Sequence, residues 1–119
     1  MSVGTKVPTL VVLGAAIGGC GNLCGNDPLM AEVSPDQRHV AVVFLRDCGA
    51  TTGFSTQVSI LDAPANLPNE AGNVAVADGN QPGWVRWEDD GTLVVGGMNV
   101  DERYLRRTEY DGIKIRYGN

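Results

Sequence analysis

The sequence predicts an all-β protein, organised as a single antiparallel sheet or a small sandwich of about six to seven strands. Three observations predict this class. The chain contains 16 glycines and six prolines among its 119 residues, and both residue types favour turns and short strands over long helices. Short apolar or alternating runs lie between these turn residues, a pattern typical of β-strands. A chain of this length supports one domain with one core.

The first core strands are expected over residues 40–45 and 54–61. The stretch "SPDQRHVAVVFLRD" begins with a Ser-Pro-Asp turn, a common turn combination. Residues 40–45 are apolar on both faces, which predicts a central strand. In "FSTQVSIL", residues 54–61, apolar side chains alternate with polar ones, which predicts a half-buried strand. The intervening "CGATTG" has the composition of a hairpin loop and places Cys48 at a strand end.

Further strands follow the longest predicted loop, residues 62–73. A short strand is expected in "NVAVADG", and "GWVRWEDDGTLVVGG", residues 83–97, predicts a hairpin that turns at Asp89-Asp90-Gly91. Trp84 and Trp87 are expected on opposite faces of this hairpin, one of them in the core.

The last hairpin is predicted to turn at Asp111-Gly112, a two-residue combination typical of tight hairpins. This register sets Arg107 opposite Arg116, and like charges that face each other repel. Either both arginines extend into water or bond acids in residues 88–90, or they form a patch for an anion or an acidic partner.

The charge of the chain narrows the classes of partner. Its formal net charge is −5 at pH 7, which argues against nucleic acid, because phosphate backbones require a basic surface. An acidic surface would instead steer the association of a cationic protein or peptide.

The N-terminus has the pattern of a secretory signal peptide. Lys6 is the only charged side chain before Cys20, and an apolar run from Val7 to Gly19 follows it. The end of this run, Ile17-Gly18-Gly19-Cys20, resembles the lipobox of bacterial lipoproteins. The resemblance implies that Cys20 becomes the first mature residue and carries acyl chains, which anchor it stably to a membrane.

This interpretation divides the chain into three parts. Residues 1–19 are expected to be the lipoprotein signal peptide, residues 20–35 the lipidated segment and tether, and residues 36–119 the antiparallel β domain. The expected location is the extracytoplasmic side of the bacterial cell envelope, at the outer membrane or in the periplasm if the bacterium is Gram-negative.

The two other cysteines, Cys24 and Cys48, form an even pair in an oxidising compartment. A bridge between them would close a loop of about 24 residues and contribute about 3 kcal/mol. A free structural thiol and a reactive or metal-binding Cys48 are the alternatives. A nucleophilic cysteine needs a nearby base, and His39 is the only histidine. One histidine and two spaced cysteines match no zinc pattern.

Two resemblances follow from these stretches. The phrases "SPDQRHVAVVF" and "GWVRWEDDGTLVV" are similar to strand phrases of TolB-type β-propeller blades, although this chain is too short for a closed propeller. The lipobox, "SPDQ", "RDCGATTGFSTQVSIL" and "VRWEDDGTL" together resemble a family of small bacterial lipoproteins that has no assigned activity. That resemblance implies lipid attachment at Cys20 and a bond between Cys24 and Cys48.

The predicted function is binding rather than catalysis, by an inhibitor or immunity-type protein, and no cofactor or metal is predicted. The alternative is a structural accessory subunit of an envelope complex. A hydrolase that uses Asp89 and Asp90 is the weakest hypothesis, because adjacent acids in a turn usually only form the turn. The candidate partner-binding residues are those of the loop after Cys48 and the two opposed arginines: Gly49, Ala50, Thr51, Thr52, Arg107 and Arg116. The 62–73 loop is a second candidate.

Overall fold

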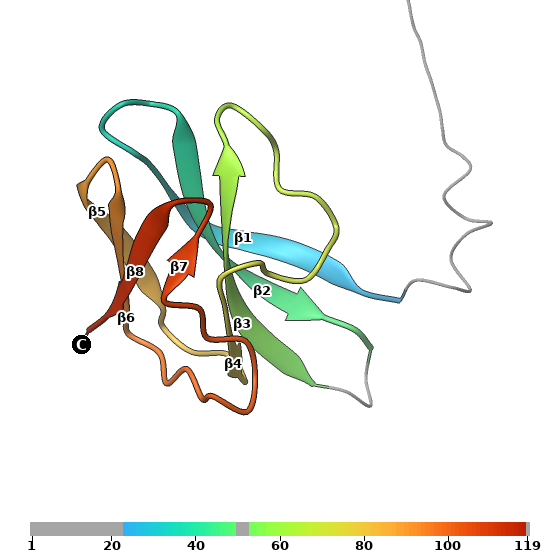
Figure 1. Ribbon diagram of the computed structural model, residues 1–119. Helices are drawn as coiled ribbons and strands as arrows, with labels where there is room; N and C mark the ends of the chain where they lie inside the picture. The colour runs from blue at the N-terminus through green and yellow to red at the C-terminus, as the bar shows by residue number, and fades with distance from the viewer. Residues whose placement is uncertain (1–22, 50–52, 119) are drawn as a thin grey trace, which may run out of the picture.

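The computed structural model describes residues 23–49 and 53–118, which form eight strands in two four-stranded sheets (Figure 1). The all-β prediction is confirmed, in its sandwich form. The predicted signal peptide, residues 1–19, and Cys20 lie outside the described residues.

The first sheet has the order β1-β2-β3-β4. Its strands are β1 (Gly25–Val33), β2 (His39–Asp47), β3 (Phe54–Asp62) and β4 (Ala75–Asp78). The second sheet has the order β5-β6-β8-β7. Its strands are β5 (Trp84–Asp89), β6 (Thr92–Gly96), β7 (Glu109–Tyr110) and β8 (Ile113–Tyr117). The β6 and β8 strands pair in parallel, which differs from the purely antiparallel arrangement that we expected.

The strand β1 corrects the predicted boundary between tether and domain. Residues 20–35 were expected to form a tether, but Gly25–Val33 pairs with β2 along its length. The strand escapes sequence detection because it has one neighbour, leaves most of its side chains exposed, and contains Pro28 beside a register shift. Proline and irregular pairing are typical of edge strands. The β domain therefore begins at Gly25.

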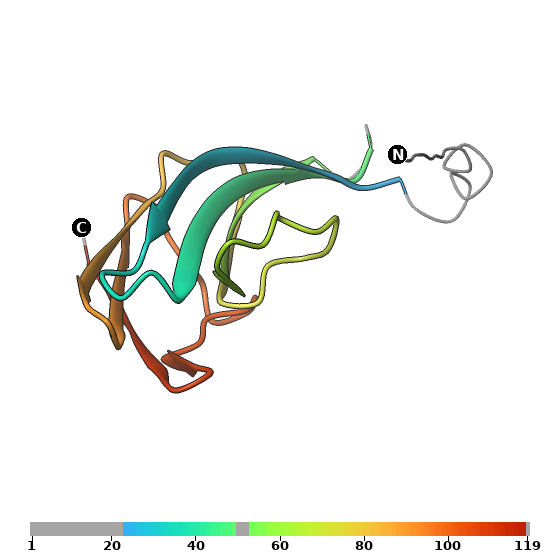
Figure 2. The ribbon, with the colours of Figure 1, turned by 90° about the horizontal axis from the view of Figure 1, so that it is seen from above.

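The core lies between the two sheets, and Figure 2 shows the long, curved β1 and β2 with the orange and red strands of the second sheet at one end. The buried residues of this cluster come from both sheets and the segment before β4: Ala41, Val43, Val58, Ile60, Val74, Ala75, Val85, Leu93, Val95, Ile113 and Ile115. The predicted central strand is confirmed, because β2 lies between β1 and β3 and is buried on both faces.

Part of the second face of β2 is covered by the 62–73 loop, the yellow-green segment between β3 and β4 in Figure 1. Leu67 packs on a small cluster of buried residues: Val40, Val42 and Phe44. Asn26 fixes the loop by donating hydrogen bonds to the carbonyl oxygens of Pro68 at 3.0 Å and Glu70 at 2.7 Å. Arg46 adds a bond to Asn69 at 3.2 Å. This loop is fastened to the sheet along its length.

The two predicted hairpin turns are present. Asp111 and Gly112 both have positive φ, 54° and 79°, as a tight hairpin turn of the mirror-image type requires. The register follows, with Tyr110 paired to Ile113. The other hairpin places Trp84 opposite Gly96, where a Cβ atom would lie 2.2 Å from the indole, so only glycine fits beneath that ring.

Candidate functional site

A disulfide between Cys24 and Cys48 fixes the open end of the β1–β2 hairpin. The two cysteines occupy the register position next to the Gly25–Asp47 pair. The predicted disulfide is confirmed. Because both sulfur atoms are in the bond, neither cysteine is the free thiol, the nucleophile or the metal ligand considered as an alternative.

The loop after this disulfide is described only in part. Ala50, Thr51 and Thr52 lie outside the described residues. The N–H of Gly49 donates a hydrogen bond to the Asp47 carboxylate at 3.0 Å, and its φ of 118° is accessible to glycine. The described end of the loop therefore forms a local turn on the last residue of β2.

Both candidate arginines have partners within the chain. The Nε of Arg107 donates to the Asn73 carbonyl oxygen at 2.9 Å, and its guanidinium lies 5.8 Å from the centroid of the Tyr110 ring. Arg116 forms an ion pair with Glu88 of β5, one of the acids that the sequence suggested for it. A shared anion patch would have to compete with these contacts.

The acidic pair in the β5–β6 hairpin builds its turn. The Asp89 carboxylate accepts a hydrogen bond from the N–H of Gly91 at 2.9 Å, and both aspartates are exposed. This bond is the usual use of an aspartate at a turn.

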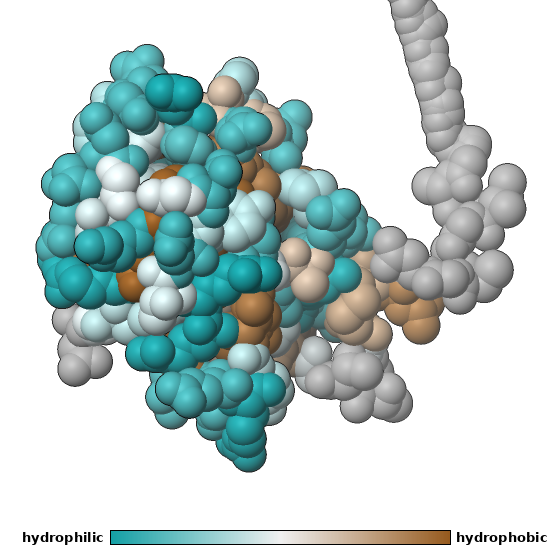
Figure 3. Space-filling model, in the orientation of Figure 1, coloured by the Kyte–Doolittle hydropathy of each residue, from teal (hydrophilic) through white to brown (hydrophobic). Residues whose placement is uncertain are grey.

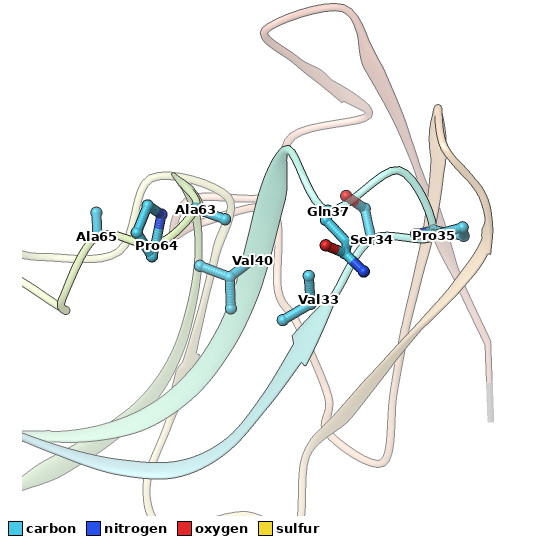
Figure 4. Close-up of a pocket in the computed structure, with 8 residues that line it drawn as sticks. All are labelled: Val33, Ser34, Pro35, Gln37, Val40, Ala63, Pro64 and Ala65. Carbon is cyan, nitrogen blue, oxygen red and sulfur yellow. The ribbon is translucent and has the colours of Figure 1, made fainter.

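An open groove lies on the first sheet, beside the turn that joins β1 to β2 (Figure 4). It encloses about 710 Å³. Figure 4 shows Val33 and Val40 between the turn on one side and residues 63–65 on the other. The lining residues are mainly apolar: Val33, Ser34, Pro35, Gln37, Val40, Ala63, Pro64 and Ala65. Val33 is 53% exposed although it is a valine, so the groove presents apolar surface to solvent.

The wall of the groove is built by the Ser-Pro-Asp turn. Ser34 is 2% exposed, and its hydroxyl donates to the Asp36 carboxylate at 2.6 Å while accepting from the backbone N–H of His39 at 3.1 Å. Asp36 also accepts from the N–H of Arg38 at 3.1 Å. The Ser34 hydroxyl and the Arg38 N–H lower the pKa of Asp36, because both stabilise its ionised form.

Gln37 completes this wall in an unusual backbone conformation. Its φ is 63°, in the left-handed region that favours glycine. The groove itself was not predicted from the sequence, because residues 63–65 join the Ser-Pro-Asp turn there only through the folding of the sheet. The described residues contain no hydrogen-bond partner for the side-chain amide of Gln37. The Ser34 hydroxyl, in contrast, forms its hydrogen bonds within the turn. The amide is therefore the polar group that the groove offers to a ligand.

The nearby serine, aspartate and histidine do not form a catalytic triad. The hydroxyl of Ser34 contacts the backbone of His39, not its imidazole. The imidazole Nε2 faces Asp62 and Asp111 instead. A nucleophile needs its base within hydrogen-bond reach, so this arrangement is a turn with a groove beside it.

Comparison with protein-family models, with curated proteins and with solved structures found no match to this chain. In the part of the chain that the structure describes, no helix is long and apolar enough to cross a membrane.

Proposed function

We propose that this chain is a small bacterial lipoprotein, anchored through Cys20, whose extracytoplasmic β domain binds a protein partner in the groove beside Gln37. The observation that carries the proposal is the groove itself, since an exposed apolar surface with few polar groups is typical of binding sites. The fold fixes both of its sides, through the hydrogen-bonded turn and the strand pairing of β2 and β3.

The disulfide supports the export of the domain. Structural disulfides persist in extracytoplasmic compartments and are rare in reducing ones. Cys24 lies four residues after Cys20 in the sequence, so the bond would hold the start of the domain close to a lipid anchor.

Exposed apolar side chains gather at this end of the domain, with Leu23 74% and Phe54 47% exposed. Figure 3 shows an apolar group at the right, where the described chain begins. Such side chains suit a surface that faces lipid.

The groove favours a partner that inserts an apolar side chain. Val33, Val40 and Pro64 offer apolar contact, and the Gln37 amide can bond to the partner's backbone or to a polar side chain. The net charge of −5 favours a cationic partner. By contrast, the 62–73 loop is bonded to the sheet through Asn26 and Arg46, which argues against its insertion into a cleft on another protein.

The proposal is tested by capturing partners from the native envelope with the full chain. Val33→Asp places a charge in the groove, and Leu29→Asp is a matched control, because both side chains lie on β1 and are 53% and 48% exposed. We expect the Val33 variant to lose a stoichiometric partner that the Leu29 variant keeps. A soluble partner would support the inhibitor type, and a membrane complex the accessory type. Equal capture by both variants would contradict a groove site.

A further inference from the structure

Three side chains that can bind a metal meet at one end of the sandwich. His39 begins β2, Asp62 ends β3, and Asp111 lies in the turn between β7 and β8. The Nε2 atom of His39 lies 4.0 Å from Oδ1 of Asp62 and 3.7 Å from Oδ2 of Asp111. The three ligand atoms all lie within 4.8 Å of one another. The cluster therefore combines side chains from both sheets.

Strand pairing fixes these positions. His39 and Asp62 are directly opposite each other in the β2–β3 ladder, so their side chains leave the same face of the sheet. Asp111 is held in the tight turn that the Tyr110–Ile113 pair closes. The cluster is thus set by the backbone and does not depend on a long free loop.

The imidazole is oriented toward the two carboxylates. The His39 side chain is 19% exposed, and its ring centroid lies 6.4 Å from that of Trp87. Trp87 is fixed in turn, because its Nε1 donates to the Glu32 carbonyl oxygen at 2.8 Å. The Nδ1 atom of His39 is buried and has no hydrogen-bond partner in the described part of the chain. When Nε2 binds a metal, the ring proton lies on Nδ1, so the ring is oriented by its contact with Trp87 and not by a hydrogen bond at Nδ1.

The donor set matches a divalent transition metal. One imidazole nitrogen and two carboxylate oxygens are ligands of Zn²⁺, and three protein ligands leave a fourth position for water. Ligand atoms about 2.0–2.2 Å from a tetrahedral metal lie about 3.4 Å from one another. The carboxylate side chains of Asp62 and Asp111 are 90% and 63% exposed, so small rotations can bring them to this spacing. Two carboxylates also balance the charge of the ion.

We infer that His39, Asp62 and Asp111 form a site for Zn²⁺ or a similar divalent transition metal, which ties the two sheets together. The inference does not depend on the proposed function, since it uses none of the residues that line the groove. A plain ion pair between a protonated His39 and the two acids is the competing explanation. That pair would not need a metal.

Calorimetric titration of the full chain with Zn²⁺ tests the site, with free thiols alkylated so that Cys20 is not a ligand. We expect one Zn²⁺ per chain and an increase in the thermal unfolding midpoint. Asp62→Asn and Asp111→Asn should each weaken binding at least about tenfold, the lower limit for losing even a supporting group at a metal site. Because Asp62 is so exposed, its variant should fold normally.

Asp90→Asn is the matched control, because Asp90 is an exposed aspartate in another hairpin turn, and it should bind Zn²⁺ like the wild type. His39→Gln should abolish the rise in the unfolding midpoint. Failure of the wild type to bind Zn²⁺, or equal affinity in the Asp62, Asp111 and Asp90 variants, would overturn the inference. A midpoint that does not change with Zn²⁺, but falls in the Asp62 and Asp111 variants and not in the Asp90 variant, would assign the cluster to an ion pair instead.

Discussion

Replacing Cys24 and Cys48 together with serine tests how far the fold depends on the disulfide. The bond joins residues that are 24 apart in sequence. In the chain-entropy model, a constraint of this length contributes about 3 kcal/mol by restricting the unfolded chain. Small domains are stable by roughly 5–15 kcal/mol, so the double variant should lose a large share of its free energy of unfolding.

Urea unfolding measures this loss, with tryptophan fluorescence as the signal, because Trp87 packs on the core between the sheets. The double variant and the reduced wild type should unfold at similarly lowered urea concentrations. Cys20→Ser is the control and should leave the midpoint unchanged, since Cys20 is not in the bond. A loss below about 0.5 kcal/mol, the usual range for surface substitutions, would refute the reasoning. It would mean that the unfolded chain already keeps the two ends of this hairpin close without the bond.

Three further predictions concern the first sheet. Gln37→Gly should raise the free energy of unfolding by about 0.5–1 kcal/mol in urea unfolding, because φ is 63° at this residue and glycine adopts the left-handed region without strain. The half-buried Leu67 packs on the outer face of β2, so Leu67→Ala should cost about 1–2 kcal/mol in the same assay, against little change for Leu29→Ala. Asp36→Asn should be less stable than the wild type at neutral pH. Since the pKa of Asp36 is lowered from 3.8 in the folded state, this difference should shrink as pH falls below 3.8 in acid-unfolding measurements.

Local signals predicted the parts of the fold that depend on local chemistry. The Ser34 hydroxyl and the Asp36 carboxylate bond the backbone two to five residues away, so their turn can be recognised from a short stretch. The Asp111-Gly112 turn likewise sets its own register. The disulfide was predictable because the lipobox resemblance accounted for one of the three cysteines.

Features that depend on distant pairing could not be predicted in this way. The strand β1 lacks alternation because it is exposed and interrupted at Pro28. The parallel pairing of β6 with β8 depends on how the segment between them crosses the sheet, and no residue pattern encodes that path. The metal cluster was missed for the same reason. A zinc pattern read along the sequence would join His39 to the cysteines. Asp62 instead meets His39 through the β2–β3 pairing, and Asp111 reaches it only through the packing of the two sheets.

The groove and the metal cluster lie on opposite faces of the same strand ends. His39 and Val40 are neighbours on β2, and successive side chains of a strand point to opposite faces. His39 accordingly joins Asp62 and Asp111, while Val40 lines the groove. Asp62 is followed directly by residues 63–65, which form the far wall of the groove. A metal bound by Asp62 would therefore fix the start of that wall without contacting a ligand in the groove. The two sites can be tested separately for this reason: Val33→Asp alters only the groove, and Asp111→Asn alters only the cluster.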